Sequence, residues 1–156
     1  MENNEKIIDV LNDLVQINND RIRGYEKAIE DTKADESNYD TLFENMIDQS
    51  REYKRELSAE IQRLGGDVDR NSTTNSGKIY RTWMDVKSAF QGHSEKSALE
   101  LCEFGEDAAQ KAYEDALSTD DLTPATRQLL LSQKAKLKES HDTIKRKRDM
   151  EVHSHS

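Results

Sequence analysis

Hydrophobic residues recur at helical spacing in four long stretches of the chain. In residues 5–31 and 37–64, apolar side chains return every three or four positions, and polar side chains fill the positions between them. The same spacing is present in residues 94–117 and 124–149. A period near 3.6 residues is typical of amphipathic helices that bury one face. The pattern therefore predicts an all-α chain with four long helices.

Residues that favour helix ends mark where two of these stretches stop and start. Gly65 and Gly66 follow the second stretch, and glycine is the usual residue for the left-handed position after a helix. Thr123 and Pro124 stand at the start of the fourth stretch. They fit the N-cap and the first helical position, respectively.

The lengths of the connections predict how the helices are arranged. Residues 32–36 and 118–123 are short connections, which join antiparallel neighbours. Residues 67–93 form a long connection, in which Tyr80 and Trp83 fit a short extra helix. We therefore predict a four-helix bundle with a long crossover between its second and third helices. The extra helix of this crossover would place Trp83 over the core.

One carboxylate, Glu106, falls on the apolar face of the third stretch. The apolar residues of that face are Leu99, Cys102, Ala109, Tyr113 and Ala116. A charged side chain within such a face is costly unless it is paired, hydrogen-bonded, protonated or bound to a metal. The position of Glu106 therefore predicts that another part of the chain supplies a partner for it.

Two interpretations of the Glu106 environment follow from the polar residues on the other stripes. The first is a buried hydrogen-bond network, which requires no cofactor. Its expected members are Asn18, Tyr25, Ser50, Tyr53, Glu106, Gln133 and His141. The second is a single iron, manganese or zinc ion bound by Glu106, His141 and Glu103. We favour the network, in which Glu106→Gln would change the melting temperature little because the amide keeps most hydrogen bonds.

Composition and charge narrow the class of protein. The chain has 156 residues, of which 35 % are charged and 33 % hydrophobic, with a net charge of −9. This length suits one domain, expected over residues 1–150, with a disordered tail over residues 151–156. A net charge of −9 disfavours nucleic-acid binding, which depends on Lys and Arg neutralising phosphates.

The sequence shows no membrane span, signal peptide or catalytic arrangement. No apolar run approaches the length that spans a bilayer, and the N-terminus lacks the pattern of a signal peptide. We therefore expect a cytoplasmic protein that does not bind membranes. Cys102 is the single cysteine, and its position on the apolar face predicts a buried, slowly reacting thiol. No arrangement typical of nucleophilic catalysis stands out, so no catalytic residue is predicted.

Short motifs in a fixed order connect the chain with a known family. They are Asn19-Asp20 with Gly24-Tyr25, Glu56-Leu57 with Leu64-Gly65-Gly66, Tyr80 with Trp83, Glu103, Gly105-Glu106-Asp107, Tyr113, Gln133, His141-Asp142 and Arg148-Asp149. With these motifs the chain resembles an uncharacterised bacterial ferritin-like four-helix-bundle family, a domain of unknown function. The wider superfamily includes bacterioferritin and rubrerythrin as distant relatives. The resemblance implies a ferritin-like fold.

The resemblance also implies where a metal site would lie. Its distant relatives build a di-iron site from one Glu on each of two helices and Glu-x-x-His on each of the other two. Asn18, Ser50 and Lys138 stand at three of the corresponding positions here, whereas Glu106 and His141 remain. This pattern indicates a degenerate metal site.

The expected function is a non-catalytic interaction or stress-associated module, acting with a protein partner or as a monomer or small homo-oligomer. The association with stress follows from analogy with the superfamily alone. The alternative is a metal-binding oxidoreductase, or a metal-handling protein, that uses the remaining ligands Glu106 and His141.

Overall fold

The computed structural model describes residues 2–32, 40–68 and 95–154, and the regular structure of these residues is entirely helical. The helices are α1 (Glu2–Thr32), α2 (Asp40–Arg63), α4 (Glu95–Leu117) and α5 (Pro124–Ser154). The prediction of an all-α chain with four long helices is confirmed. The extra helix predicted around Trp83 lies outside the described residues.

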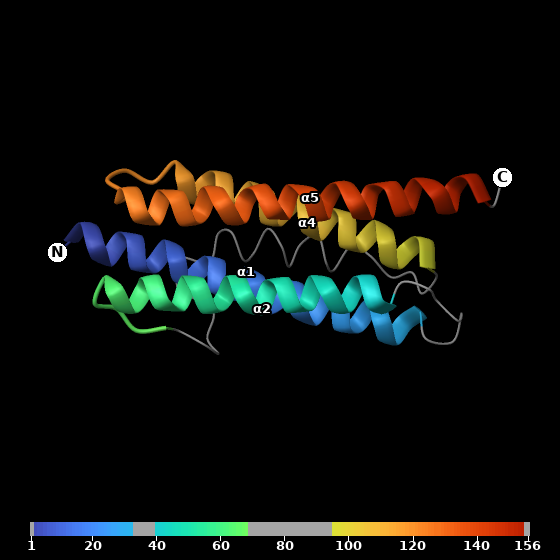
Figure 1. Cartoon of the computed structure of the whole chain (residues 1–156), viewed down its shortest axis with the longest axis horizontal. Helices are drawn as coiled ribbons and strands as arrows, with labels where there is room; N and C mark the ends of the chain where they lie inside the picture. Colours follow the sequence, from blue (N-terminus) through green and yellow to red (C-terminus); the bar gives the residue numbers. More distant parts are fainter. Residues whose placement is uncertain (1, 33–39, 69–94, 155–156) are drawn as a thin grey trace.

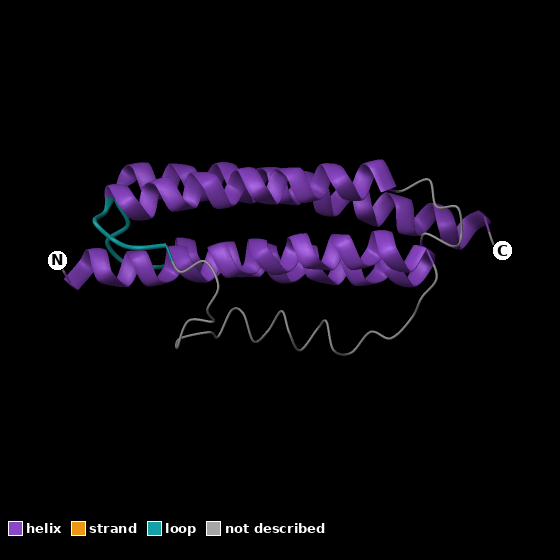
Figure 2. Cartoon of the chain, turned by 90° about the horizontal axis from the view of Figure 1, so that it is seen from below, coloured by secondary structure: helices purple, strands orange, loops and turns teal. Residues whose placement is uncertain are grey.

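The four helices form two antiparallel pairs. Figure 1 shows α1 and α2 side by side in opposite directions, and α4 and α5 in a second pair of the same kind. In Figure 2, seen from below, α1 and α4 form one layer and α2 and α5 form the other. The two antiparallel pairs meet mainly through α1 and α4, while α2 and α5 contact each other much less. Since α2 and α4 run in the same direction in Figure 1, the chain between them connects opposite ends of the bundle.

Two glycines end α2 and bring its end against α1. Gly65 has a φ of +89°, in the left-handed region that glycine adopts without strain. The amide of Gly66 donates to the carbonyl of Ile61 at 2.9 Å, which closes the last turn. A Cβ atom on Gly66 would lie only 2.7 Å from Cδ1 of Ile8. The absence of a side chain at Gly66 therefore allows the close approach to α1.

A threonine cap ties the start of α5 to the end of α2. Oγ1 of Thr123 accepts a hydrogen bond from the amide of Thr126 at 3.2 Å, as the N-cap prediction requires. The hydroxyl of Thr126 donates to Oε2 of Glu60 at 2.5 Å, and Arg63 donates to the same carboxylate. This contact joins the two helical pairs at one end of the bundle.

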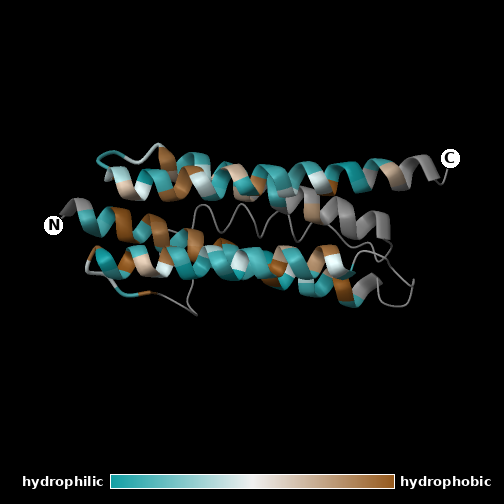
Figure 3. Ribbon diagram, in the orientation of Figure 1, coloured by the Kyte–Doolittle hydropathy of each residue, from teal (hydrophilic) through white to brown (hydrophobic). Residues whose placement is uncertain are grey.

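The core consists of two apolar clusters. Figure 3 shows hydrophobic and hydrophilic positions following one another along each helix, as amphipathic helices require. The buried residues of the first cluster are Ile7, Leu11, Leu14, Val15, Ile17, Tyr53, Leu57, Ile61, Ala109, Ala112, Tyr113, Ala116, Leu130 and Leu137. The buried residues of the second cluster are Ile22, Tyr25, Ala28, Phe43, Met46, Ile47, Cys102 and Ile144.

Buried polar residues separate these two clusters along every helix. In α1 the boundary falls at Asn18 and Arg21, in α2 at Ser50, in α4 at Glu106 and in α5 at Ser140, and all are buried. We refer to these five residues as the polar layer. Its position in the middle of the bundle makes it the first place to look for a functional site.

The last helix is longer than its apolar pattern indicates. The sequence predicts an end near Asp149, whereas α5 extends to Ser154. No glycine or proline follows Pro124. Because no such residue interrupts the helix, it continues past Ile144, the last buried apolar residue among the described side chains.

Candidate functional site

The partner of Glu106 is Arg21. Nε of Arg21 lies 2.6 Å from Oε1 of Glu106, and each residue is 1 % exposed. The pair joins α1 to α4 across the centre of the bundle. A buried, hydrogen-bonded cation thus meets the charge of Glu106, which is one of the arrangements that its position on the apolar face predicts.

The remaining groups around the Arg21 guanidinium come from α2 and from two aromatic rings. Nη1 donates to Oγ of Ser50 at 2.7 Å and to the carbonyl of Met46 at 3.2 Å. The guanidinium carbon lies 5.3 Å from the ring centroid of Tyr25 and 5.9 Å from that of Tyr53, both within the range of cation–π attraction. Arg21 therefore holds three of the four helices together.

Tyr25 completes the contacts of the bonded carboxylate oxygen. Its hydroxyl donates to Oε1 of Glu106 at 2.5 Å. Burial raises the pKa of Tyr25 well above its ordinary value, and the Glu106 carboxylate raises it further. Burial alone would lower the pKa of the Arg21 guanidinium, but Glu106 and the tyrosines reverse this, so that its pKa lies above the ordinary arginine value. Arg21 is therefore a permanent cation, and Tyr25 a neutral donor.

The helical phase of α1 explains how Arg21 reaches the core. Leu14, Asn18, Arg21 and Tyr25 follow at spacings of four, three and four residues, which places them on one face of the helix. Arg21 was not among the residues expected at this site, although this spacing was the available signal. Arginine is seldom fully buried without a partner, and here the partner lies 85 positions further along the chain.

A second buried network lies next to the ion pair and contains no cation. Nδ2 of Asn18 donates to the hydroxyl of Tyr113 at 3.0 Å, and this hydroxyl donates to Oε1 of Gln133 at 2.6 Å. Nε2 of Gln133 in turn donates to the carbonyl of Tyr53 at 3.2 Å and to Oε1 of Glu56 at 3.1 Å. Burial raises the pKa of Tyr113, so this hydroxyl stays protonated.

The seven residues expected in a single network are therefore distributed over several places. Glu106, Tyr25 and Ser50 meet through Arg21. The members joined through Tyr113 are Asn18 and Gln133, and Tyr53 contributes its carbonyl there and its ring to Arg21. The seventh residue, His141, lies at the bundle surface.

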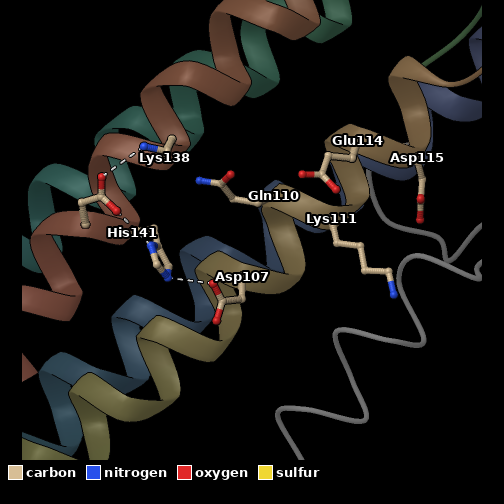
Figure 4. Close-up of a pocket in the computed structure, with 8 residues that line it drawn as sticks. Asp107, Gln110, Lys111, Glu114, Asp115, Lys138 and His141 are labelled. Carbon is tan, nitrogen blue, oxygen red and sulfur yellow. Dashed lines mark hydrogen bonds and ion pairs between the residues drawn. The ribbon is translucent and has the colours of Figure 1, made fainter.

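His141 contacts the residue that follows Glu106. Its Nε2 lies 2.7 Å from Oδ1 of Asp107, and its Nδ1 lies 3.2 Å from Oδ1 of Asp142. Figure 4 shows His141 of α5 pointing toward Asp107 of α4, beside a groove of about 410 Å³ between the two helices. The hydrogen bond from His141 lowers the pKa of Asp142, and Lys138 adds to the effect. The contact with Asp107 fastens α4 to α5, whereas the contact with Asp142 lies within α5.

The metal interpretation required Glu106, His141 and Glu103 at one place. The side chain of Glu103 is outside the described residues. Among the side chains that the structure describes, no three from His, Cys, Asp and Glu are grouped closely enough to hold a metal ion. The metal ligands remain a prediction from the sequence.

Cys102 lies one turn before Glu106, in the second apolar cluster. Its thiol is buried. Burial raises the pKa of this thiol, and the nearby Glu106 carboxylate raises it further. The neutral thiol therefore packs as a small apolar side chain.

Fold and site together define an all-helical bundle whose polar layer is built on a buried arginine–glutamate pair. The family model of the domain of unknown function DUF2383 matches residues 6–119, and the chain belongs to this family. The matched region contains Arg21 and Glu106 and ends before α5. Comparisons with curated proteins and with solved structures gave no match. None of the described helices is both long and apolar enough to cross a membrane.

Proposed function

We propose that this chain is a non-catalytic helical-bundle module that acts by binding a partner protein or further copies of itself. The observation that carries this proposal is the Arg21–Glu106 pair, which fills the centre of the polar layer with the chain's own cation. A bundle core organised in this way serves as a rigid scaffold. Recognition then falls to the outer faces of the helices.

The helix directions support a ferritin-like arrangement for this module. In such bundles two antiparallel pairs are joined by one long crossover, so that the second and third long helices run in the same direction. α2 and α4 have this relationship in Figure 1. It is the connection that the sequence resemblance implies.

The residues of the polar layer do not fit the di-metal centre of ferritin-like relatives. Such a centre needs a carboxylate from each of the four helices, together with two histidines. Here Glu106 bonds a guanidinium, Ser50 accepts from the same guanidinium, and Asn18 bonds Tyr113. A divalent cation at this place would meet a fixed positive charge and too few anionic ligands. The ion pair thus supports a structural role for the polar layer.

The side chains on the outer faces of the bundle favour assemblies of few subunits over large shells. Among the described residues, the large hydrophobic side chains that are exposed are Leu131 and Met150. Extended shells need broad apolar patches on several faces, and these two isolated side chains do not provide them. We therefore propose a monomer or small homo-oligomer that meets its partner through charged and polar surface. A role in stress responses is proposed by analogy with the superfamily alone.

Metal analysis tests the part of this proposal that gives the polar layer a structural role without a metal ion. The full chain is purified without affinity tag or chelator, its iron, manganese and zinc are measured, and its melting temperature is compared before and after EDTA treatment. We expect far less than one metal ion per chain and equal melting temperatures, because Arg21 already neutralises Glu106.

The opposite result would favour the metal-binding alternative. It would consist of at least one ion per chain in the untreated protein and a lower melting temperature after EDTA. Glu106→Gln and His141→Ala would then each have to reduce the bound metal, because the alternative assigns both residues as ligands. Glu52→Gln, a change to an exposed carboxylate of α2, is the matched control and should leave the metal content unchanged.

A further inference from the structure

The C-terminal end of α5 carries a run of basic residues and extends past the other helices. Figures 1 and 2 both show this end of α5 beyond the ends of α1, α2 and α4. Residues 145–148 read Lys-Arg-Lys-Arg in a chain whose net charge is −9. Lys145 and Arg146 are exposed, and Lys147 is partly buried. We refer to residues 145–148 as the basic tip of α5.

The cations of the basic tip have no counter-charge among the side chains that the structure describes. Earlier on α5, Lys138 lies 3.7 Å from Asp142, one turn further along the same helix. Lys145, Arg146 and Lys147 form no such pair with a described residue. The side-chain hydrogen bond of Arg146 goes to a neutral hydroxyl. The basic tip therefore presents uncompensated positive charge to the solvent.

The groove between α4 and α5 has the opposite character. The described residues that line it are all polar or charged (Figure 4), and its volume is about 410 Å³. Carboxylates outnumber lysines among them: the carboxylates are Asp107, Glu114, Asp115 and Asp142, and the lysines are Lys111 and Lys138. His141 contacts two of these carboxylates, which leaves the other two for an outside cation.

These two carboxylates are Glu114 and Asp115, on the outer side of α4. The side chain of Glu114 is 62 % exposed and lies 3.6 Å from Lys134. Asp115 is exposed and forms no ion pair with a described side chain. Exposed pairs at such distances contribute little and exchange partners readily. Both carboxylates can therefore accept a further cation.

The basic tip is too far from these carboxylates to neutralise them within one chain. The contact with Glu114 places Lys134 at the height of the acidic groove. From Lys134 to Lys145 the helix rises by about 16 Å. This is roughly twice the Debye length of about 8 Å at physiological ionic strength. The two charged surfaces complement each other, but only between different molecules.

We propose that a second copy of the chain binds to the α4–α5 face in antiparallel orientation. The basic tip of each α5 then lies against Glu114 and Asp115 of the other copy. A two-fold axis makes this contact occur twice and closes the assembly at two chains. A different acidic protein would satisfy the basic tip and leave the acidic groove without a cation, whereas a second copy satisfies both. This inference rests on the proposed function, because it specifies the binding of further copies.

Sedimentation velocity of the full chain at several protein concentrations is the first test. We expect a dimer whose dissociation constant rises by about tenfold or more between about 0.05 M and 0.5 M salt, because salt screens exposed charges. A chain that stays monomeric at low salt overturns the inference and leaves binding to a different protein in place. Failure of the structural role of the polar layer would appear instead in the metal content and the response to EDTA.

Reversing the charges tests which surfaces meet. Lys145→Glu with Arg146→Glu, and separately Glu114→Lys with Asp115→Lys, should each give a monomer at low salt, because like charges then meet at both contacts. An equimolar mixture of the two variants should form a heterodimer, since both contacts again join opposite charges. The inference is overturned if either variant dimerises like the wild type, or if the mixture stays monomeric.

A matched control separates the α4–α5 face from general charge effects. Arg51→Glu with Arg55→Glu reverses two exposed cations of α2, and so changes the net charge as much as the variant of the basic tip. The control should dimerise with a dissociation constant within about threefold of the wild type, the range expected for charges outside an interface. Loss of the dimer in this control would mean that net charge, and not the α4–α5 face, determines association.

Discussion

Glu106→Gln is the substitution that most directly tests the role of the buried ion pair. When the helical phase of Glu106 is considered alone, this change is expected to have little effect. Arg21 reverses the expectation, because the guanidinium is 1 % exposed and would stay buried without its counter-charge. The glutamine amide can still accept hydrogen bonds from Arg21 and Tyr25, so the loss is mainly electrostatic.

The size of the effect follows from the burial of both partners. Two unit charges about 4 Å apart interact by about 4 kcal/mol at an effective dielectric constant near 20. Removing one partner of a buried pair costs about 3–5 kcal/mol. We therefore expect Glu106→Gln to lower the free energy of unfolding by about 3–5 kcal/mol. For a chain of this size, that corresponds to a fall in melting temperature of roughly 6–20 °C.

Urea unfolding followed by circular dichroism measures this quantity. Arg21→Met should destabilise the chain to a similar degree, because it leaves the carboxylate buried and uncompensated. The double variant should lose less than the sum of the two single losses by about 2 kcal/mol or more, since it leaves no isolated charge. The matched control is the exposed i,i+3 pair Glu52–Arg55 on α2, whose neutral variants should unfold close to the wild type.

Two results would refute this reasoning. The first is a loss below about 1 kcal/mol in both single variants, which is the range of exposed ion pairs. The second is strict additivity in the double variant, which would mean that Arg21 and Glu106 do not interact. Either result would also remove the observation on which the proposed function rests.

Three further predictions concern other parts of the chain. Cys102 should react with a thiol reagent at neutral pH only about as fast as the chain unfolds, because burial and Glu106 raise the pKa of its thiol; rapid labelling of the native protein would contradict this. Gly66→Ala should lower the free energy of unfolding by about 1–3 kcal/mol through its clash with Ile8, and Ile8→Ala should reduce the additional loss. Light scattering should show a monomer or small oligomer, and a particle of about a dozen or more subunits would contradict the proposed assembly.

The fold was largely predictable from hydrophobic spacing and turn residues. The glycines after α2 and the Thr123–Pro124 start of α5 act locally, so the residues themselves indicate these helix ends. The end of α5 was harder to predict from the sequence. It lies beyond Ile144, the last buried apolar residue among the side chains that the structure describes, and hydrophobic spacing up to Ile144 does not indicate where the helix ends.

The candidate site was predictable only in part. The position of Glu106 on an apolar face indicated a buried carboxylate, and it is buried. The identity of its partner depends on which of several polar residues shares the same height in the bundle. His141 bonds Asp107 and not Glu106 because adjacent residues of a helix point about 100° apart, and Asp107 is the one that faces His141. The register of α1 against α4 brings Arg21 to the height of Glu106. Helical period alone does not specify that register, because it reports the face of a residue and not its height relative to a neighbouring helix.

The two-pair arrangement of the helices has a consequence for the order of folding. The α1–α2 and α4–α5 pairs form from residues that are near one another in sequence, so their loops close at low entropic cost. Arg21 and Glu106 are 85 positions apart and lie in different pairs. Their desolvation requires both pairs to be present. The contact between Arg21 and Glu106 therefore forms when the α1–α2 pair docks onto the α4–α5 pair. The kinetic signature of the ion pair is therefore slower unfolding, with little acceleration of folding.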